Sequence, residues 1–346
     1  YHKVTALIRD GKVLSCYTPG FGGVAEAVFK MAIGNRLGFA FDKNLKNDEL
    51  FGYNYASFVL ESADGEVYGT LLGETTYLAE FTKGGEKIAL SDLLSAYEGK
   101  LEPVYRRKVD QNIGKIPEIK YVSEEKYKAK TSVAKPRVLI PVFPGTNCEY
   151  DSKKAVEAAG AKAEIFVINN LSPEKIKESA ASLSEKIRSA QAIFIPGGFS
   201  GGDEPDGSGK FITAFFRNAE MKDAVSDLLQ RRDGLMLGIC NGFQALIKLG
   251  LVPFGEIRDP DENAPTLTYN KIARHQSRIV RVKAVSGRSP WMLKVKPGDV
   301  FAVPVSHGEG RFVASPEMLK TLAENGQIAT QYVDYAGNPT YDIDFN

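Results

Sequence analysis

The chain has 346 residues, and its 44 Lys and Arg against 43 Asp and Glu give a formal net charge of +1. This length accommodates about two domains with full cores, and the balanced charge does not indicate nucleic acid or an acidic surface as a partner. No apolar stretch approaches the ~20 residues that cross a bilayer, so we expect no membrane association. The three cysteines are too few for a disulfide framework and indicate a reducing compartment, the cytoplasm. Because the chain begins at Tyr1 without a signal-peptide pattern, we interpret it as a piece of a longer protein.

Residues 1–108 predict a compact α+β domain. Four β-rich runs are expected to form strands, and the first two flank a hairpin dipeptide: residues 4–8, 13–17, 56–61 and 65–72. Helices are expected over residues 24–33 and over residues 91–97, with Ser91 as the cap of the second. The glycine-rich turn at residues 20–23 either holds phosphate on its N–H groups or is a plain tight turn. The absence of a P-loop lysine favours the plain turn.

Residues 109–135 differ in character from the segments on either side. They are rich in Lys, Glu and Tyr and have no sustained hydrophobic period, which favours an ordered linker on the surface. No aromatic platform accompanies the lysines, so we interpret them as solvated charges rather than as nucleic-acid contacts.

From residue 136 onward strands alternate with helices, which predicts a doubly wound, mostly parallel sheet with helices on both faces. The expected strands are residues 138–143, 163–168, 192–195 and 235–239. The expected helices are residues 149–159, a helix opened by Ser172-Pro173, and two helices within 211–229. Active sites in such sheets lie beyond the carboxyl ends of the strands. Residues 144–147, residues 196–198 and Cys240 all follow strands, so we expect three loops to meet at one sheet edge.

Cys240 lies between an apolar strand and a helix that ends at Gly250, and Gly238 and Gly242 stand two residues away on either side. This is the spacing of a nucleophile elbow, a sharp turn that tolerates little side chain at the flanking positions. The positive end of the following helix favours the thiolate over the thiol. The alternative is a structural cysteine that happens to lie between two glycines.

A thiolate nucleophile needs a base and a group that orients the base. The chain has three histidines, of which His2 lies in the first domain and His275 is assigned no role. His307 follows the apolar strand 300–306, and in extended chain it shares a face with Glu309. We therefore expect His307 to be the base and Glu309 to hold its tautomer. A surface-loop histidine is the alternative.

The oxyanion that forms during attack on a carbonyl needs N–H donors. The N–H of Asn241, the residue after the nucleophile, is one donor by the geometry of the elbow. The second is expected from the loop 197–199, where glycine allows a close approach of the backbone to a substrate. Gly198 is the first choice for this donor and Phe199 the second, whereas a simple strand-ending turn is the alternative.

These motifs resemble those of a known family. Residues 238–244 (GICNGFQ), together with His307 and Glu309, resemble the Cys-His-Glu triad of class I glutamine amidotransferases, whose fold is flavodoxin-like. Residues 145–149 (GTNCE), 196–203 (PGGFSGGD) and 307–311 (HGEGR) narrow the resemblance to the glutaminase portion of the large, single-chain formylglycinamidine ribonucleotide synthases. The match covers residues 136–346. Residues 1–108 more loosely resemble the C-terminal domain of aminoimidazole ribonucleotide synthetases.

The resemblance implies that Cys240 attacks the side-chain amide of L-glutamine, that His307 protonates the departing ammonia, and that water hydrolyses the thioester. Gln244 matches the family position that helps to hold glutamine, and Gly197 and Phe199 are expected in the same glutamine site. A local hydrogen bond within the helix is the alternative for Gln244. The ammonia is expected to pass to the synthetase domains of the full protein, which bind ATP and Mg²⁺. No cofactor or metal is expected in the glutaminase domain.

Members of this family continue with another strand and a Pro-His-Pro-Glu type motif where this chain stops at Asn346. We therefore expect a truncated amidotransferase domain with a bare sheet edge. Two other functions remain open: a stand-alone Cys hydrolase of the same fold, and a non-catalytic fragment that docks on the synthetase domains. The placement of Glu309 beside His307 disfavours the hydrolase. The first domain, which shows no site of its own, suits the fragment.

Overall fold

The computed structural model describes residues 1–106, 114, 116–122, 127–130, 132–200 and 209–345. The chain divides into two compact units, Tyr1–Arg107 and Lys108–Asn346, each of which has its own hydrophobic core. Among the helices in these described ranges, none has the length and apolarity that crossing a membrane requires.

The unit Tyr1–Arg107 combines helices with a four-stranded sheet of order β4-β2-β5-β6 and a two-stranded sheet β1-β3. Helix α2 buries Ala27 and Phe29 in a core shared with Phe39 and Phe81 of the larger sheet. The elements are α1 (His2–Arg9), β1 (Val13–Tyr17), α2 (Gly23–Ile33), β2 (Gly38–Phe41), α3 (Asn47–Phe51), β3 (Val59–Ser62), β4 (Gly73–Thr76), β5 (Glu80–Lys83), β6 (Glu86–Ala89) and α4 (Leu90–Gly99). The predicted α+β class of this unit is confirmed.

Some details of this unit differ from the prediction. Residues 4–8 belong to helix α1 and not to a strand, because no residue of α1 is buried and no sheet contact selects the extended form. Residues 65–72 contain no strand. The strand β4 begins instead at Gly73, where φ is 142° and an added Cβ would overlap Ala40 O, so that only glycine fits. Helix α4 is present, but its N-cap is Ala89 and not Ser91.

The unit Lys108–Asn346 contains the alternating strands and helices that the sequence predicts. Its first elements are β7 (Arg137–Val142), α5 (Glu149–Ala158), β8 (Lys162–Val167), α6 (Pro173–Ile187), β9 (Ala192–Ile195), α7 (Lys210–Phe216), α8 (Ala219–Ser226), η2 (Asp227–Arg231), β10 (Leu235–Gly238), α9 (Asn241–Leu249) and α10 (Leu251–Phe254). Its later elements are β11 (Thr266–Thr268), β12 (Gln276–Ala284), η3 (Pro290–Met292), β13 (Val300–His307), β14 (Arg311–Val313), α11 (Pro316–Glu324) and β15 (Thr330–Tyr332).

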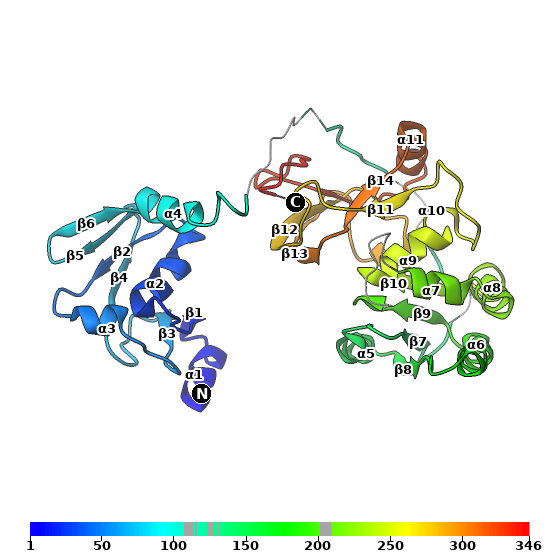
Figure 1. Ribbon diagram of the computed structural model, residues 1–346, viewed down its shortest axis with the longest axis horizontal. Coiled ribbons are helices and arrows are strands. Elements are labelled where there is room, and N and C mark those ends of the chain that lie inside the picture. Colours follow the sequence, from blue (N-terminus) through cyan, green and yellow to red (C-terminus); the bar gives the residue numbers. More distant parts are fainter. Residues whose placement is uncertain (107–113, 115, 123–126, 131, 201–208, 346) are drawn as a thin grey trace. The chain divides into compact units, whose positions relative to one another are not determined.

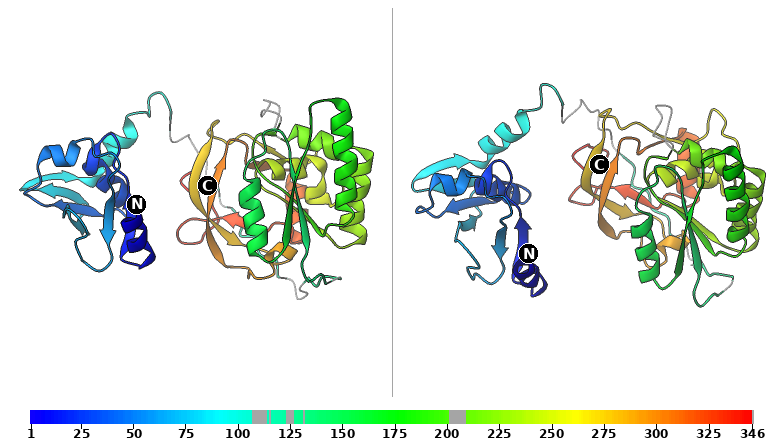
Figure 2. Two further views of the ribbon diagram at one scale, coloured as in Figure 1. Left: turned by 90° about the horizontal axis from the view of Figure 1, so that it is seen from below. Right: turned by 60° about the horizontal axis from the view of Figure 1, so that its bottom comes forward.

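Strands β7 to β10 form a parallel sheet of order β10-β9-β7-β8. Alternate residues of these strands face two different cores, because successive side chains of a strand point to opposite faces. Leu139 and Ile193 pack with helices α6, α8 and α9, whereas Ile140 and Phe194 pack in a second cluster against α5. Helices α5 and α6 lie on opposite sides of the strands (Figures 1 and 2). The predicted doubly wound parallel sheet is therefore confirmed.

The strand that leads to His307 belongs to a different sheet. β13 pairs antiparallel with β12, and β12 pairs antiparallel with β15, so that the three strands form a sheet of order β13-β12-β15. Strands β11 and β14 form a further antiparallel pair. The alternation of strands and helices in the first half of this unit predicts parallel pairing and does not extend to these strands, since β11 to β14 follow one another without an α-helix and only β15 is preceded by one, α11.

Hydrogen bonds connect the described residues of the segment 114–133 to later parts of the second unit. Tyr121 N donates to Val285 O at 2.7 Å. Tyr127 Oη and Lys130 N both donate to Asp233 Oδ2, at 2.8 and 2.9 Å. These two hydrogen bonds hold the pKa of the Asp233 carboxyl below its ordinary value, and the bond from Lys130 N has the larger effect. The segment is thereby attached to the turn that precedes β10.

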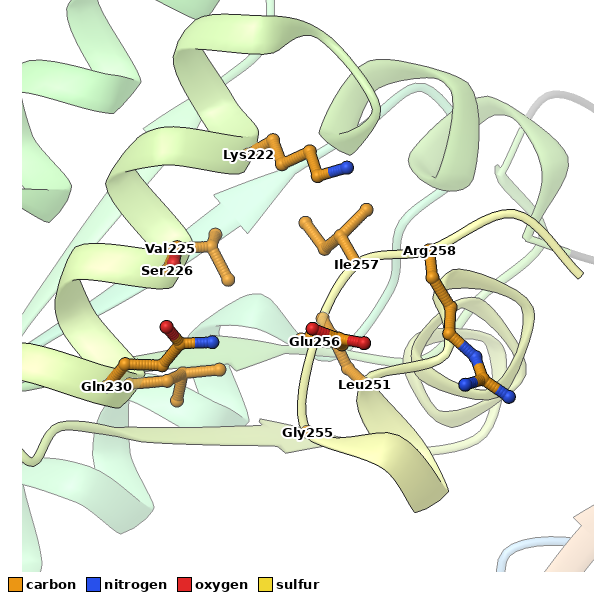
Figure 3. A pocket seen from close by; sticks show the side chains of 10 residues that line it. Lys222, Val225, Ser226, Gln230, Leu251, Gly255, Glu256, Ile257 and Arg258 are labelled. Atoms are coloured by element: carbon orange, nitrogen blue, oxygen red, sulfur yellow. The ribbon is translucent and has the colours of Figure 1, made fainter.

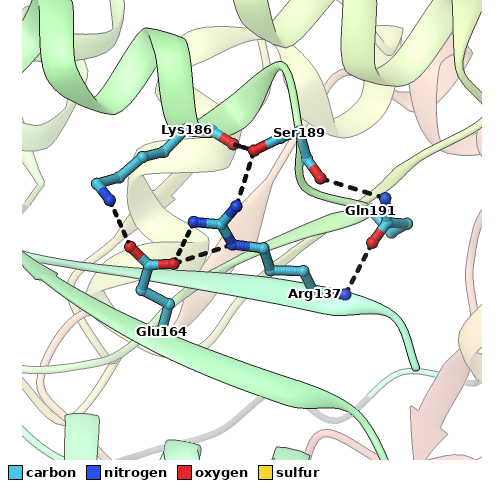
Figure 4. Close-up of polar contacts among 5 residues, drawn as sticks. All are labelled: Arg137, Glu164, Lys186, Ser189 and Gln191. Atoms are coloured by element: carbon cyan, nitrogen blue, oxygen red, sulfur yellow. Dashed lines mark hydrogen bonds and ion pairs between the residues drawn. The ribbon is translucent and has the colours of Figure 1, made fainter.

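A polar cluster joins the first strand of the parallel sheet to its neighbours (Figure 4). Arg137 Nε donates to Glu164 Oε2 at 2.9 Å, and Lys186 Nζ donates to Glu164 Oε1 at 2.7 Å. Arg137 also donates to Ser189 Oγ through its side chain and to Gln191 Oε1 through its backbone N–H. The bonds from Lys186 and Arg137 hold the pKa of Glu164 below its ordinary value, although burial opposes them.

The substitution Glu164→Gln is expected to lower the free energy of unfolding by about 1–2 kcal/mol at neutral pH, because it leaves two cations without their carboxylate. Since the folded-state pKa of Glu164 is depressed, its contribution is complete above the unfolded-state value of about 4.3 and is lost as the pH falls through the folded-state value. Urea unfolding of parent and variant at about pH 7 and about pH 3 measures both effects.

The matched control is Glu157→Gln, which removes an exposed i,i+4 pair with Lys153 at 3.8 Å. Its expected effect is within about 0.5 kcal/mol. Equal losses for the two variants at neutral pH, or a Glu164→Gln loss that persists in acid, would contradict the role given to Glu164.

Candidate functional site

Cys240 occupies the turn between β10 and α9. Its φ of 54° and ψ of −111° lie outside the regions that most residues occupy, and the residue is exposed. An added Cβ at Gly238 would lie 2.6 Å from Gly242 C, and an added Cβ at Gly242 would lie 2.9 Å from Pro196 O. Both flanking positions therefore require glycine, and the turn has the elbow conformation that its spacing predicts.

The loops that follow β7 and β9 are joined by backbone hydrogen bonds. Asn147 N donates to Gly197 O at 2.9 Å, and Phe199 N donates to Gly145 O at 2.8 Å. Between these bonds Gly198 has a φ of 125°, and an added Cβ there would lie 2.7 Å from Asn147 N. Glycine at position 198 is thus required by both the backbone conformation and the neighbouring loop.

The loop after β9 also lies directly beside the thiol. An added Cβ at Gly197 would lie 3.1 Å from Cys240 Cβ and 3.8 Å from its Sγ. The N–H of Gly198 is outside the two bonds that join the loops, whereas the N–H of Phe199 is used in one of them. Asn241 is the first residue of α9, so its N–H is among those that a helix leaves without an internal partner. This arrangement favours Gly198 and Asn241 over Phe199 as donors.

A chain of buried amides connects the elbow to the segments on both sides of it. Asn241 Oδ1 accepts from Ser200 N at 3.1 Å, and Asn241 Nδ2 donates to Gln244 Oε1 at 3.1 Å. Gln244 Nε2 in turn donates to Glu309 O at 3.0 Å. Asn241 is 1% exposed and Gln244 is 7% exposed. Gln244 therefore ties the segment after β13 to helix α9, while the roles of Gln244, Gly197 and Phe199 in holding glutamine stay predictions.

The imidazole of His307 is half-buried at the end of β13. Its Nδ1 lies 2.9 Å from Asn270 Oδ1, and an added Cβ at Gly310 would overlap the ring. The neighbouring His275 contacts Ser306 Oγ through Nε2 at 2.8 Å. Burial, and then the charge of His275, hold the pKa of His307 below its ordinary value. His307 is therefore neutral near pH 7, the form in which one ring nitrogen accepts a proton.

Glu309 was predicted to share a face with His307 because side chains alternate along an extended strand, but the structure does not continue the strand to Glu309. Strand β13 ends at His307 and residues 308–309 form a bend, so a spacing of two no longer fixes the direction of the side chain. Burial lowers the pKa of Lys248, and the charge of Glu309 opposes this shift. The carboxylate thus acts electrostatically on the ammonium of helix α9. The expected role of Glu309 in orienting His307 stays a prediction.

Two cavities lie in the same unit. One has a volume of 220 Å³ and lies between α8, η2 and residues 255–258, with Lys222, Gln230 and Arg258 around it (Figure 3). The other has a volume of 400 Å³ and lies between α7, α9 and residues 260–266, where three cations including Lys248 line it. Neither Cys240 nor His307 is among the residues that line these two cavities. Within the described ranges, no three His, Cys, Asp or Glu side chains are grouped to hold a metal ion.

Two features of this site were not predicted from the sequence. Asn270 follows the short strand β11 with no motif around it, so only the folded structure reveals its contact with His307. The side chain of Asn241 is buried and bonded, whereas the sequence drew attention only to its N–H. Three residues of the predicted glycine-rich motif, Gly201, Gly202 and Asp203, lie outside the described residues.

Comparison with known proteins agrees with the resemblance. Residues 135–346 match the model of the CobB/CobQ-like glutamine amidotransferase domain. The phosphoribosylformylglycinamidine synthase subunit PurQ of Rubrobacter xylanophilus is 31% identical over 209 residues, which cover 60% of this chain and 80% of that protein. PurQ of Treponema denticola is 37% identical over 207 residues, covering 57% and 72%. The structure of PurLQS from Thermotoga maritima aligns with a TM-score of 0.41 and 21% identity, covering 61% and 84%.

Proposed function

Residues 135–346 of this chain belong to the CobB/CobQ-like glutamine amidotransferase domain family, and from this premise we propose that the chain is the glutaminase part of a phosphoribosylformylglycinamidine synthase. It hydrolyses L-glutamine through a thioester on Cys240. The ammonia is used in the ATP-dependent conversion of formylglycinamide ribonucleotide to formylglycinamidine ribonucleotide, in purine biosynthesis. The PurQ relatives carry the name of this synthase.

The reaction begins when His307 takes the proton of the Cys240 thiol and the sulfur attacks the side-chain amide carbon of glutamine. The N–H groups of Gly198 and Asn241 stabilise the oxyanion of the tetrahedral intermediate. The C–N bond then breaks as His307 gives its proton to the leaving nitrogen, which departs as ammonia. A water molecule, deprotonated by His307, attacks the thioester, releases glutamate and restores the thiol. Glu309 orients His307 in this proposal.

The observation that carries the proposal is the backbone of Cys240. A non-glycine residue with a φ of 54° is strained, and such strain persists where the surroundings impose it. At Cys240 this strained backbone conformation places an exposed sulfur at the first turn of α9, beside Gly197.

The synthetase domains of the full protein are the proposed partner. They bind ATP and Mg²⁺, whereas the glutaminase domain needs no cofactor because the thiol, the imidazole and two N–H groups supply the whole reaction. The three cysteines are free, which fits the reducing environment of the cytoplasm as the proposed location.

Incubation of the chain with the glutamine-like electrophile diazo-oxo-norleucine, followed by mass spectrometry, is expected to give one adduct, on Cys240. The substitution Cys240→Ala should abolish the adduct, because it removes the nucleophile that the electrophile requires.

The chain offers a closely matched control in Cys148. This residue is also exposed, also precedes a helix and also has a positive φ, of 67°. The substitution Cys148→Ala should leave the adduct unchanged, because no glutamine-binding groups are proposed around Cys148. An adduct on Cys148 or Cys16, or labelling that survives Cys240→Ala, would overturn the assignment of the nucleophile.

A further inference from the structure

The side chains of Asn241 and Gln244, which we call the amide pair, lie between two backbone groups. Asn241 Oδ1 accepts from Ser200 N at 3.1 Å, and Asn241 Nδ2 donates to Gln244 Oε1 at 3.1 Å. Gln244 Nε2 then donates to Glu309 O at 3.0 Å. Ser200, Asn241 and Gln244 are all buried. Three hydrogen bonds in series therefore connect the loop after β9, the start of α9 and the segment after β13.

The backbone groups at the two ends fix the direction of each amide in the pair. A backbone N–H only donates, so Ser200 N requires the oxygen of Asn241 and leaves its NH₂ group to face Gln244. A backbone carbonyl only accepts, so Glu309 O requires the NH₂ group of Gln244 and leaves its oxygen to face Asn241. These two requirements agree at the bond between the side chains. The amide pair therefore has one arrangement that satisfies all its groups.

Asn241 uses its side chain outside its own helix. Asparagine at the start of a helix commonly accepts from the N–H groups of the first turn. In α9 the N-cap residue Cys240 makes no side-chain cap bond, and Asn241 Oδ1 accepts instead from Ser200 N, 41 positions away in the chain. The residue that follows the proposed nucleophile thus contributes its side chain to a neighbouring loop.

The loop after β9, residues 196–200, is bonded to two neighbours. The bonds at Gly197 O and Phe199 N join it to residues 145–147, which follow β7. The bond at Ser200 N joins it to α9, the helix that begins directly after the proposed nucleophile. The Ser200 hydroxyl does not contribute, because its Oγ is buried and has no hydrogen-bond partner among the residues that the structure describes. The end of this loop is therefore held to α9 through its backbone N–H.

We propose that the side chain of Asn241 is a positioning residue, which holds the loop that carries Gly198 at a fixed place relative to Cys240. This inference rests on the proposed function, in which the N–H groups of Gly198 and Asn241 stabilise the oxyanion. Gly198 lies two residues before Ser200, and an added Cβ at Gly197 would lie 3.8 Å from Cys240 Sγ. Asn241 therefore serves both donors, the first with its own backbone and the second through its side chain.

The spacing of the two donors matters for one step of the reaction. Donors that are already in place stabilise the oxyanion without rearrangement, and a displacement of about 1 Å can cost about 10²-fold in rate. A reagent that alkylates the thiol without forming an oxyanion does not depend on this spacing. Loss of the amide pair is therefore expected to slow the chemical step on glutamine and to leave the access to the thiol unchanged.

The test replaces Asn241 by leucine, which has a similar shape, forms neither side-chain bond and keeps the backbone N–H. In the protein with its synthetase domains, kcat for glutamine hydrolysis should fall by about 10²-fold, while KM should stay within about threefold of the parent value. Alkylation of Cys240 by iodoacetamide, followed by mass spectrometry, should also stay within about threefold. The rate at Cys148 in the same sample is the internal reference.

Hydrogen exchange at the Ser200 amide, measured by NMR, gives a second readout that does not require glutamine. Because this N–H is buried and bonded to Asn241, it should exchange slowly in the parent. The substitution Asn241→Leu should speed the exchange by about fivefold or more, the value of one hydrogen bond. Asn325→Leu is the matched control, because Asn325 Nδ2 donates to Gln327 Oε1 at 3.2 Å in an exposed amide pair. This control should leave kcat and the exchange of Ser200 unchanged.

A second variant covers the case in which circular dichroism shows that Asn241→Leu does not fold. Gln244→Met keeps the acceptor for Ser200 N and removes the partner that holds Asn241 in place. Its kcat should fall by about fivefold, with faster exchange at Ser200. Parent values of both quantities in this variant would overturn the positioning role.

The outcomes separate the two proposals. A parent protein that does not hydrolyse glutamine would overturn the proposed function, whereas the exchange of Ser200 would still report on the amide pair. A parent that hydrolyses glutamine, together with an Asn241→Leu variant that keeps the parent kcat, would overturn the positioning role alone. Equal losses in glutamine hydrolysis and in alkylation of Cys240 would mean that Asn241 only maintains the fold, and they would overturn the positioning role as well.

Discussion

Replacement of Cys240 by alanine is expected to lower glutamine-dependent formation of the amidine by at least about 10⁴-fold, the scale on which removal of a catalytic nucleophile acts. Amidine formation from added ammonia should be unchanged, because ammonia bypasses the thioester. The measurement is product formation by the protein with its synthetase domains, supplied with ATP and either glutamine or an ammonium salt.

The ratio of the two activities is the informative quantity, since a variant that misfolds loses both. Cys148→Ala should keep the parent ratio, because Cys148 lies at the start of a different helix, α5. Normal use of glutamine by the Cys240→Ala variant would show that the thiol is not the nucleophile, and the proposed function would then be wrong.

The substitution Gly242→Ala is expected to lower the free energy of unfolding by about 3 kcal/mol, although alanine is the better helix former by about 1 kcal/mol. The added methyl would overlap Ile195 O and would lie 2.9 Å from Pro196 O, and both atoms belong to the backbone at the end of β9. Backbone at this position cannot yield without moving the loop beside Cys240. Labelling of Cys240 should therefore slow together with the loss of stability.

Urea unfolding followed by circular dichroism measures the first effect, and the rate of diazo-oxo-norleucine labelling measures the second. Gly287→Ala is the control, because an added Cβ at Gly287 meets nothing closer than 3.7 Å and its φ is not positive. Its expected effect is within about 0.5 kcal/mol. A Gly242→Ala variant that is as stable as the parent would mean that the elbow and β9 are not in tight contact.

The parallel sheet and the elbow could be predicted from the sequence because their signals are local. Strand β9 was predicted with the bounds that the structure has, and α5 differs by one residue. The buried strands alternate with helices whose apolar spacing and caps are strong, as at Ser172, whose Oγ accepts from Lys175 N. Glycine stands on both sides of Cys240 because neighbouring backbone atoms leave no room for a side chain there, and this requirement is visible in the local sequence.

The structure of other parts of the chain could not be predicted from the sequence, because it depends on tertiary contacts or on their absence. Residues 4–8 are rich in β-branched residues, but α1 has no core contact to enforce a strand. The bend after β13 ends the alternation that placed Glu309 on the same face as His307. Asn270 lies 37 positions from His307 in the chain, so their hydrogen bond leaves no local pattern.

The close approach of Gly310 to His307 has a consequence for the entropy of the site. With a glycine backbone against one face of the imidazole and Asn270 at Nδ1, a half-turn of the ring about its χ2 axis would replace the bonded nitrogen by a carbon. The ring therefore has one favoured orientation before any substrate arrives. The side chain of His307 therefore loses its rotational freedom when the chain folds, and a molecule that binds beside the ring has no further ordering of this side chain to impose.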